Sequence, residues 1–396
     1  MKLPFKHYKL LNFLDSKQWQ FQLSVLLFLL VLATTYPKYI ELLNDPSPVT
    51  TYQYLFEKIE CPLTPLLNGD IESHGSKIAF RLTPVLLAKL LGTYDLHNGQ
   101  GIIQLYLLQS LLLLPFLYML TKVVYELTDK YTTVWTVVAF SAVYTSTAFF
   151  WDYDFWFDGY AYFFLMAAMY FRNRIGIFLM LQLASWTDER AIAASIGVFL
   201  FYTLMENNFQ LIRMSQIIPS SIKKRAAIVI ISLLTYLFLR LYLTLFFNLH
   251  TPIGNNAGVG LELIEYQINH RLIGLFLSFE GLWLIFVVTI IVSLRKGNFI
   301  LATLLICGIL IHIIVAFSVF DISRSLAYAF PYFIVCTVIL FKNHRLALNN
   351  SLSVSTLLCI LVPTQFLIYF VRPIPWTIFS YSEIIVVGKN VFYALK

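Results

Sequence analysis

Long apolar runs, separated by short polar connections, follow one another along most of this chain. A helix needs roughly 17–25 apolar residues to cross about 30 Å of hydrocarbon, and only helices or closed barrels satisfy the backbone there. The runs are too long and too uniformly apolar for barrel strands. We therefore predict an all-α, polytopic membrane protein with about eleven transmembrane helices, at 21–36, 102–121, 132–150, 159–171, 175–186, 191–205, 226–247, 272–293, 299–318, 326–341 and 352–371.

Two segments of the pattern predict more than a simple span. A single helix over 175–205 would extend about 46 Å, so we interpret it as a helical hairpin with Asp188–Arg190 at its apex. The connection 37–101 is the longest outside the membrane, and its amphipathic stretches Thr51–Glu60 and Ser76–Leu91 predict helices that lie in the membrane interface.

Composition and charge agree with one membrane domain over residues 1–396. Hydrophobic residues make up 59% of the chain and charged residues 12%, and the mean hydropathy is +0.74. The net charge of +7 does not indicate nucleic acid, because most Lys and Arg lie in short connections on one side, which is then cytoplasmic together with the N-terminus. Within this domain we expect a core module at 21–175, further transmembrane helices at 175–371 and an exterior tail at 372–396.

Four connections place their acids and arginines on the opposite, exterior side. The first contains Asp70, Glu72 and His74, where a carboxylate can take a proton from an acceptor hydroxyl. The alternative is a solvated loop in which Ser73 or Ser76 caps a helix.

The second connection contains Asp152, Asp154 and Asp158 among aromatic residues. Asp152 and Asp154 share a face if the loop is extended, and Asp154 and Asp158 share one if it is helical. Either pair suits a hard divalent cation such as Mg²⁺ or Mn²⁺. The alternative for the aromatic residues is the belt that tryptophan and tyrosine form at membrane interfaces.

Arginines beside acids mark the third and fourth connections. Arg190 follows Asp188 and Glu189, and Arg324 follows Asp321. Arginine suits a phosphate group, so Arg190, Arg324 and the interfacial Arg81 are candidate phosphate-binding residues. The alternatives are a self-contained turn with an Arg190–Asp188 pair, and a local salt bridge between Asp321 and Arg324 at i,i+3 spacing.

Two further charged residues lie inside predicted spans. Arg240 and Glu280 are at similar depth below the exterior ends of 226–247 and 272–293. They are candidates for a buried ion pair with a structural role, because a bare charge in lipid is costly.

The order of these features over residues 20–175 resembles the GT-C superfamily of membrane glycosyltransferases. One span leads to a long exterior loop with an early acid, and two spans then lead to a loop with Asp-x-Asp. The resemblance implies that Asp70 is the catalytic carboxylate, with Glu72 as substitute, and that Asp152 and Asp154 bind a divalent metal. It implies a polyprenyl-phosphate or polyprenyl-diphosphate sugar as donor. The chain departs from better-known members in having His74 after the acid and no large soluble domain after its last span.

We therefore expect a glycosyltransferase of a bacterial inner (plasma) membrane, with an extracytoplasmic active site. The catalytic group would be Asp70, Glu72 and His74, the phosphate would bind to Arg81, Arg190 and Arg324, and the other acids of the site would be Asp158, Asp188, Glu189 and Asp321. Its partners would be the lipid-linked donor, membrane lipids and a glycan, lipid or protein acceptor.

Two different functions remain open at this point. A polymerase or ligase of lipid-linked polysaccharide would depend on Arg190 and Arg324 more than on Asp70. A transporter or lipid flippase would perform no chemistry, but transporters place charges near the bilayer midplane and often show inverted repeats. Here the charges gather towards one face and no repeat is visible.

Overall fold

Helices form nearly all of the part of the chain that the computed structural model describes. That part comprises residues 14–35, 37, 39–40, 50–65, 74–92, 99–152, 157–210, 214–219, 221–222, 224–253, 257–266, 268, 271–362, 365–367, 371–373 and 389. The exterior tail expected at 372–396 lies almost wholly outside it.

The first half of the chain contains ten helices within its described residues. They are α1 (Trp19–Thr34), α2 (Thr50–Glu60), the 3₁₀ helix η3 (His74–Phe80), α3 (Leu82–Leu91), α4 (Gly99–Leu127), α5 (Lys130–Ala142), α6 (Tyr144–Trp151), α7 (Asp158–Tyr170), α8 (Arg174–Ser185) and α9 (Arg190–Glu206).

The second half continues the bundle and ends in two short strands. Its helices are the 3₁₀ helix η5 (Met214–Gln216), α10 (Arg225–Phe247), α11 (Leu263–Tyr266), α12 (Arg271–Phe279), α13 (Leu282–Arg295), α14 (Phe299–Phe317), α15 (Ile322–Ala327), α16 (Phe330–Asn343) and α17 (Arg345–Leu361). The strands β1 (Gln365–Leu367) and β2 (Val371–Pro373) pair antiparallel.

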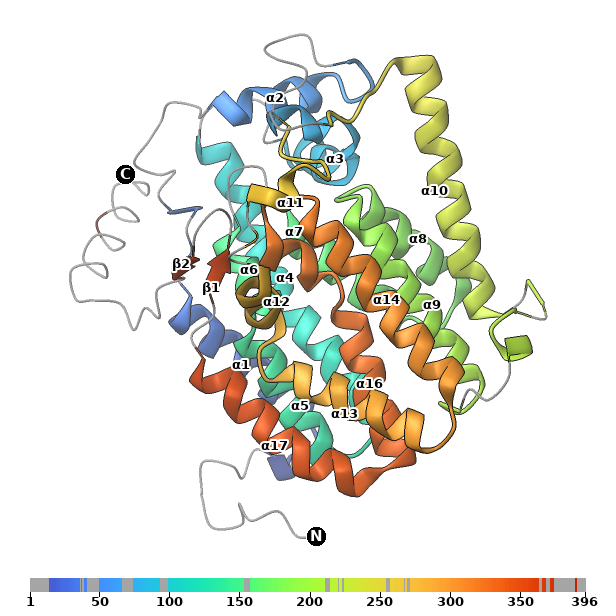
Figure 1. Cartoon of the computed structure of the whole chain (residues 1–396). Helices are drawn as coiled ribbons and strands as arrows, with labels where there is room; N and C mark the ends of the chain where they lie inside the picture. The colour runs from blue at the N-terminus through green and yellow to red at the C-terminus, as the bar shows by residue number, and fades with distance from the viewer. Residues whose placement is uncertain are drawn as a thin grey trace.

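The long helices form a bundle whose two ends differ (Figure 1). We call the end with η3, α3 and α11 the upper end, and the end where α16 meets α17 the lower end. Helix α10 runs along one side towards the upper end, next to α8 and α9. The all-α expectation is confirmed, and so is the helical hairpin, since α8 and α9 are separate helices that contact each other.

Within the described residues, three helices are each long and apolar enough to cross a membrane: Gly101–Leu127, Arg225–Phe247 and Phe299–Phe317. Two bent pairs raise the number to five if each pair counts as one span. The pair α5 and α6 bends by 46°, and the pair α12 and α13 bends by 91°.

The sharper bend lies at Glu280 and Gly281, between α12 and α13. Glu280 has a φ of 47°, and Ser355 of α17 donates its hydroxyl hydrogen to the carbonyl of Gly281 at 2.7 Å. A Cβ at position 281 would lie only 2.0 Å from the carbonyl oxygen of Ser355. Glycine is therefore required where α17 crosses this bend.

The last predicted span, 352–371, is wrong in its bounds. Helix α17 begins at Arg345 and ends at Leu361, and β1 and β2 occupy the residues where the span was expected to end. The sequence supplies the reason, because Pro363 follows the helix and a proline disfavours helical geometry in the residue before it.

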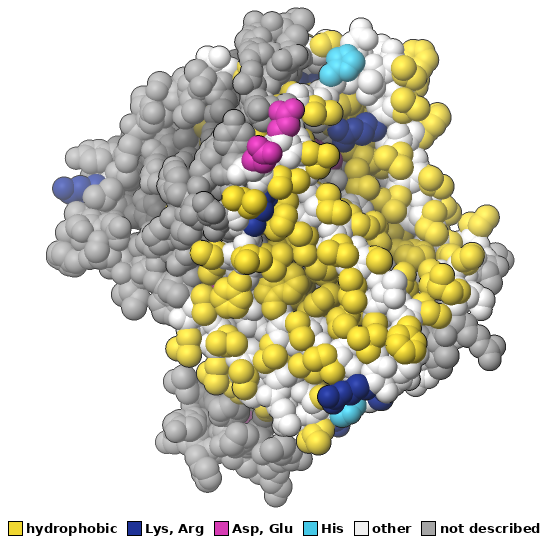
Figure 2. All heavy atoms as spheres, in the orientation of Figure 1, with side chains coloured by type: hydrophobic (Ala, Val, Ile, Leu, Met, Phe, Trp, Pro, Cys, Tyr) yellow, Lys and Arg dark blue, Asp and Glu magenta, His cyan; other side chains and the backbone are white. Residues whose placement is uncertain are grey.

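Apolar side chains cover the middle of the face shown in Figure 2, over α10, α13 and α14, and charged side chains lie above and below them. The exposed apolar residues of these helices include Leu234, Phe238, Leu241 and Leu245 of α10, Val287 and Ile291 of α13, and Phe299, Leu310 and Ile314 of α14. An apolar surface of this extent is not suited to water. It agrees with the membrane-compatible lengths of the helices.

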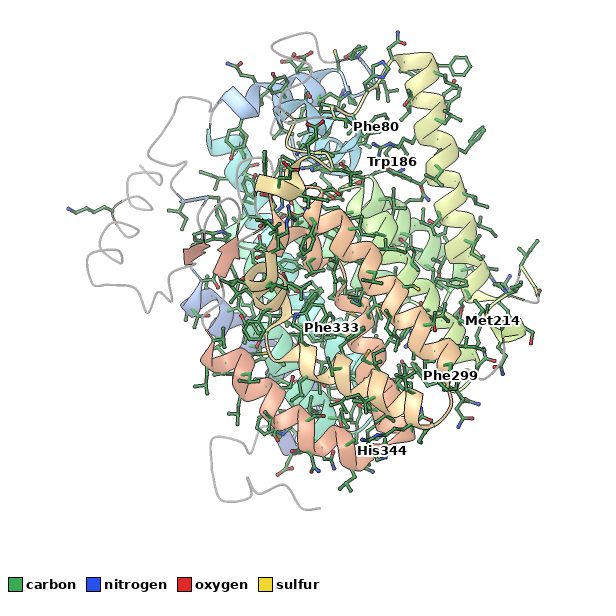
Figure 3. All side chains as sticks on the ribbon, viewed as in Figure 1. Phe80, Trp186, Met214, Phe299, Phe333 and His344 are labelled. Carbon is green, nitrogen blue, oxygen red and sulfur yellow. The ribbon has the colours of Figure 1, made fainter. Side chains whose placement is uncertain are left out.

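The interior is packed with aromatic and aliphatic side chains from helices in both halves of the chain. Phe333 of α16 stacks on Phe279 of α12 with ring centroids 3.9 Å apart, and it is labelled near the centre of Figure 3. At the upper end, Phe80 and Trp186 belong to a separate small apolar cluster with Leu243. This second cluster joins η3, the α8–α9 connection and α10.

Candidate functional site

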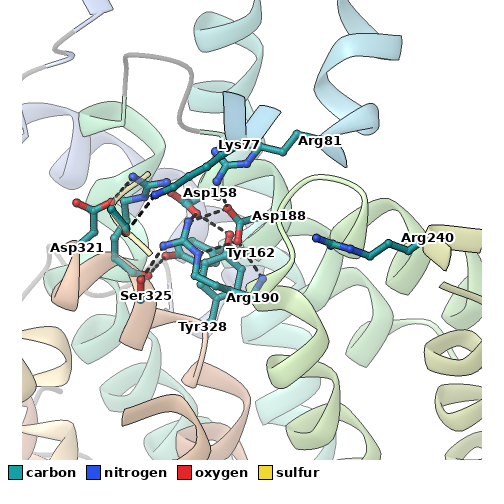
Figure 4. Close-up of polar contacts among 12 residues, drawn as sticks. Lys77, Arg81, Asp158, Tyr162, Asp188, Arg190, Arg240, Asp321, Ser325 and Tyr328 are labelled. Atoms are coloured by element: carbon teal, nitrogen blue, oxygen red, sulfur yellow. Dashed lines mark hydrogen bonds and ion pairs between the residues drawn. The ribbon is translucent and has the colours of Figure 1, made fainter. Parts of the chain in front are cut away.

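Asp158 is the centre of a buried polar network at the upper end of the bundle (Figure 4). It is the first residue of α7, and its side chain is 0% exposed. Its Oδ1 accepts hydrogen bonds from Nη2 of Arg190 at 2.7 Å and from the hydroxyl of Tyr328 at 2.6 Å. Its Oδ2 accepts from Nε of Arg324. One carboxylate thus joins residues from α7, α9, α15 and the α15–α16 connection.

Arg190 binds two aspartates through the two edges of its guanidinium. Nε and Nη2 donate to the two carboxylate oxygens of Asp188, each at 2.7 Å. Nη1 donates to the hydroxyl of Ser325 at 2.8 Å, and the guanidinium lies 4.9 Å from the ring centroid of Tyr328. The bidentate pair with Asp188 is the local turn that the sequence allowed, but Arg190 also reaches across to α7 and α15.

Arg324 joins the network to Asp321, the other charged residue of the fourth predicted exterior connection. Its Nη1 donates to Asp321 at 2.7 Å, which confirms the i,i+3 pair. Its backbone carbonyl accepts a hydrogen bond from the hydroxyl of Tyr162 at 2.9 Å. Arg324 is 2% exposed, so both its charge and its backbone are fixed inside the protein.

Arg81 brings the interfacial segment into the same network. Its guanidinium lies 3.0 Å from Asp188, and both side chains are buried. The next turn of chain is fixed as well, because Thr83 donates its N–H to the carbonyl of Trp186 at 3.0 Å and its hydroxyl hydrogen to Leu183 at 2.9 Å. The start of α3 is therefore bonded to the apex of the α8–α9 hairpin.

A cavity of about 260 Å³ lies beside this network. Its charged lining consists of Lys77, Arg81, Arg190 and Arg324 with the acids Glu189 and Asp321. Its other wall is formed by Val259 and by the end of α14 with residues 318 and 319. We call it the cation cavity; its volume is near the lower end of the ~300–1,000 Å³ typical of small-ligand sites.

The charges of the site are shifted by burial and by one another. Burial alone raises the pKa of Asp188, but Arg190 first and Arg81 second hold that pKa well below its ordinary value. Asp188 is therefore an anion that fixes two guanidiniums. Burial lowers the pKa of Lys77 to about 7, although Asp321 opposes the shift. The charge of Lys77 consequently changes near neutral pH.

Asp152 lies beside this network, and it was expected to bind a metal with Asp154. Asp152 is 0% exposed, accepts the hydroxyl of Tyr144 at 2.8 Å on Oδ1, and has no hydrogen-bond donor at Oδ2 within the described residues. Burial first, and the charge of Asp158 second, raise its pKa well above the ordinary value, which favours a neutral carboxyl group.

A hard divalent cation needs several oxygen ligands. Among the described residues, no group of three or more His, Cys, Asp or Glu side chains could hold a metal ion. Asp152 alone therefore does not make up a site, and Asp154 lies outside the described residues.

The structure brings together most of the predicted site residues whose side chains it describes. Arg81, Asp158, Asp188, Arg190, Asp321 and Arg324 form one network, and Glu189 lines the cavity beside it. Asp70 and Glu72 lie outside the described residues, and His74 begins η3 without a described side chain.

The expected pair between Arg240 and Glu280 is wrong. Arg240 donates to Tyr236 at 2.6 Å and to Thr251 at 2.5 Å, and it lies apart from the network in Figure 4. The carboxylate oxygens of Glu280 have no hydrogen-bond partner in the described part of the chain. The bend between α12 and α13 turns Glu280 into the interior, whereas α10 holds Arg240 against the ring of Phe80.

Sequence reasoning missed the polar partners that complete the network. Tyr144, Tyr162, Ser325 and Tyr328 each bond to a charged residue or to its backbone. The chain has 24 tyrosines, so no single one stood out from an aromatic belt. A usable signal was the spacing of Arg324, Ser325 and Tyr328, which places three polar groups within about one turn of helix.

A second cavity, of about 540 Å³, lies next to the first and is apolar. It is lined by α3, by the end of α8 and by the last turns of α10, with Leu82, Leu86, Leu183, Trp186 and Leu243 among its residues. Arg81 lines the first cavity and Leu82, the next residue, lines the second, so both cavities border the start of α3. Leu86 is 55% exposed, so this apolar cavity borders the outer surface of the bundle.

Comparisons of the chain with models of protein families, with curated proteins and with solved structures found no match.

Proposed function

We propose that this protein is a membrane-embedded glycosyltransferase that takes a sugar from a polyprenyl-phosphate or polyprenyl-diphosphate donor. The observation that carries the proposal is the cation cavity. Three arginines and a lysine from distant segments line a single space at one end of an apolar helical bundle. A lipid-linked sugar phosphate needs a cationic site at that position, because its head is anionic and its tail requires hydrocarbon.

The proposal places the bundle in a bilayer with its upper end on the extracytoplasmic side. The three long apolar helices, the two bent pairs and the apolar face of Figure 2 support this placement. The shorter helices α1, α7, α8, α9, α16 and α17 would complete about eleven crossings. The inner membrane of a bacterium is the compartment we propose for it.

The phosphate of the donor would lie in the cation cavity. Arg190 and Arg324 are held by Asp158, so their positions are set before a ligand arrives. Preorganised cations stabilise the negative charge that develops on a leaving phosphate. Lys77 and Arg81 line the same space from η3 and its junction with α3, and would complete the binding of the phosphate.

The apolar cavity would take the first isoprene units of the donor. It adjoins the cation cavity at the start of α3, and Leu86 and Leu90 beside it are exposed on the outside of the bundle. A donor could then keep its head in the polar site and its tail in lipid without crossing a charged surface. This arrangement avoids burying unpaired polar groups against hydrocarbon.

The proposed reaction breaks the bond between the anomeric carbon and the phosphate oxygen, and the electron pair leaves with the polyprenyl phosphate. A new bond forms between the anomeric carbon and an acceptor oxygen, whose proton passes to a carboxylate. We assign this base to Asp70, with Glu72 as substitute and His74 beside them, from the layout of the first exterior loop. Asp158 and Asp188 would act as positioning residues, because their oxygens hold the arginines.

The test supplies purified protein in nanodiscs with a panel of polyprenyl-linked, labelled sugars and looks for labelled product. Arg190→Lys and Arg324→Lys are expected to lower transfer by roughly 10²-fold, because a lysine cannot reproduce the planar guanidinium contacts. Asp70→Asn is expected to abolish transfer while donor binding persists. Arg240→Lys is the matched control, since Arg240 lies at the same end and does not line the cation cavity.

Size-exclusion profiles and melting temperatures would establish that each variant is folded. Full transfer by folded Asp70→Asn, Arg190→Lys and Arg324→Lys proteins would refute the proposal.

A polysaccharide polymerase or ligase is the second candidate, and the buried arginine network favours it over a transporter, because the charges gather at one end of the bundle. Such an enzyme would use the same lipid-linked donors and would depend on Arg190 and Arg324. The Asp70→Asn variant separates the two functions. The protein would be identified as a ligase if the Asp70→Asn variant still transferred a whole glycan chain and the Arg190→Lys variant lost that transfer.

A further inference from the structure

A second basic cavity lies at the lower end, where the base of the α8–α9 hairpin meets the start of α10. Its volume is about 910 Å³. It is lined by Arg172, Asn173, Arg174, Ile175, Glu206, Lys224 and Arg225, so four cations face one acid. We call it the lower basic cavity. The proposed transfer reaction does not use it.

Two of its arginines are fixed by the protein. Arg172 pairs with Glu126 at 2.6 Å, and Nε of Arg225 donates to the carbonyl of Arg172 at 2.8 Å. Glu206 accepts the backbone N–H of Arg225 at 2.9 Å and lies 4.0 Å from Nζ of Lys224. These contacts set the shape of the cavity and leave more positive than negative charge around it.

Arg174 adds charge without an ion pair in the described part of the chain. It is the first residue of α8, and its side chain is exposed. Lys224 is also partly exposed and has only the long contact with Glu206 among the described residues. The two side chains are therefore available to an anion that enters from outside the protein.

Exposed apolar side chains surround this cavity. Ile175 lies in its lining and is 74% exposed, and Leu179 one turn further along α8 is also exposed. Met214, Ile218 and Ile222, on the connection from α9 to α10, are exposed as well. Figure 3 shows Met214 on this connection, far from Trp186 at the other end of the hairpin. A free phosphate would not need such neighbours, whereas a phospholipid places its acyl chains beside its headgroup.

The position along the bundle matches the opposite membrane surface. Helix α8 spans about 18 Å and α9 about 26 Å between this cavity and the hairpin apex that carries Arg190. These lengths approach, but do not reach, the ~30 Å thickness of the hydrocarbon core. Because the two basic cavities lie at opposite ends of this hairpin, they would face opposite leaflets when the bundle lies in a bilayer.

We propose that the lower basic cavity binds the phosphate headgroup of one anionic phospholipid from the cytoplasmic leaflet. Arg174 and Lys224 contact the phosphate, Arg172 and Arg225 form the floor of the cavity, and the acyl chains lie against Ile175 and Leu179. The lipid thereby holds α8, α9 and α10 together at the end remote from the network of Asp158. This binding shares the membrane placement proposed above but does not depend on sugar transfer.

The test compares lipids retained by purified protein in native mass spectrometry after incubation with phosphatidylglycerol or phosphatidylcholine. Wild type is expected to retain one phosphatidylglycerol per chain in preference to phosphatidylcholine. The double variant Arg174→Gln/Lys224→Gln is expected to lose this retention by roughly 25-fold, because each cation near an anionic lipid surface contributes about a fivefold factor. The variant spares Arg172 and Arg225, whose contacts are internal.

The matched control is Lys342→Gln/Arg345→Gln, which removes the same charge from exposed positions at the same end. It is expected to retain the lipid as wild type does. Three results would each overturn the proposal. The two double variants could retain the same amount of phosphatidylglycerol, wild type could retain as much phosphatidylcholine as phosphatidylglycerol, or inorganic phosphate at a concentration similar to that of the lipid could displace it. If the double variant does not fold, the single Arg174→Gln protein gives the same comparison with a smaller change. Transfer activity is measured separately, so a failure here leaves the proposed reaction standing.

Discussion

The two ends of the α8–α9 hairpin both carry arginines, but these arginines differ in burial and in ion pairing. At the upper end, Arg190 is 9% exposed and is bound by Asp158, Asp188 and Ser325. At the lower end, Arg174 is exposed and has no ion pair within the described residues. The upper arginines are held by acidic residues of the protein before any ligand arrives. Around the lower basic cavity, basic side chains outnumber acidic ones.

The difference teaches how an apolar helical bundle can use the same residue type for two purposes. Buried guanidiniums must be compensated inside the protein, since an isolated buried charge is very costly. Exposed guanidiniums at a membrane surface are compensated by water and by lipid phosphates instead. Substitutions at the upper end should therefore change stability strongly, and substitutions at the lower end should change lipid binding with little effect on stability.

The largest effect is expected from Asp158→Asn. The change removes the charge that compensates Arg190 and Arg324, and breaking a buried pair in this way costs about 3–5 kcal/mol. Unfolding of the purified protein in mixed micelles would measure the loss. Glu262→Gln is the control, because Glu262 is an exposed acid at the same end, and its change should stay within about 0.5 kcal/mol. Equal stability of the two variants would contradict the central place of Asp158.

Tyr328→Phe tests the next contribution to the upper network. The ring that lies against Arg190 remains, but the hydroxyl that donates to Asp158 at 2.6 Å is lost. Hydrogen bonds to charged groups contribute about 1.5–3 kcal/mol, so a loss of that size is expected in the same unfolding experiment. Tyr170→Phe, at a tyrosine with no hydrogen bond in the described part, should leave stability unchanged. An equal loss of stability in Tyr170→Phe would show that removing any tyrosine hydroxyl destabilises the protein, and would contradict the specific role of Tyr328.

The pH dependence of Lys77 should give an effect similar in size to that of Tyr328→Phe. Burial lowers the pKa of Lys77 to about 7, below the ordinary value of 10.5, so the unfolded chain binds more protons between these two values. The stability contributed by position 77 should therefore rise with pH across this window, by up to about 1.4 kcal/mol per pH unit. The measurement is the difference in unfolding free energy between wild type and Lys77→Gln at pH 7 and pH 9. A difference that falls as pH rises would contradict the burial of this lysine.

The smallest change in stability is expected at the lower end. Arg174→Gln removes an exposed cation without an ion pair in the described part, so the free energy of unfolding should change by less than about 0.5 kcal/mol in lipid-free detergent. Melting temperatures in detergent would check this expectation. A loss comparable to that of Asp158→Asn would show that the two ends of the hairpin do not differ as described.

The sequence predicted the helices well, because apolar runs of more than about ten residues favour helices over strands. The local pairs of Arg190 with Asp188 and of Arg324 with Asp321 were alternatives that the sequence left open, and both pairs are present in the structure. The bends at Val143 and at Glu280 were not predictable in this way. Neither has a proline, and at the second bend the backbone of Gly281 contacts Ser355 of another helix.

The central role of Asp158 could not be read from local spacing either. It was expected as one of three acids in a loop, yet its main partners lie 32 and 166 residues away. Long-range pairings of this kind depend on how helices pack, and apolar periodicity carries little information about them. The tyrosines of the network could not be predicted either, because a tyrosine ring is compatible with any buried helix.

The distance in sequence between Asp158 and Arg324 has a consequence for how the protein is made. When α7 leaves the ribosome, the segment that carries Arg324 has not yet been synthesised. Asp158 can pair with this second arginine only after 166 more residues have been added to the chain. Until then the nascent chain holds an incompletely neutralised acid among apolar helices. A chain that stops before Ile322 lacks Arg324, so it can never neutralise Asp158 in the way that the complete network does.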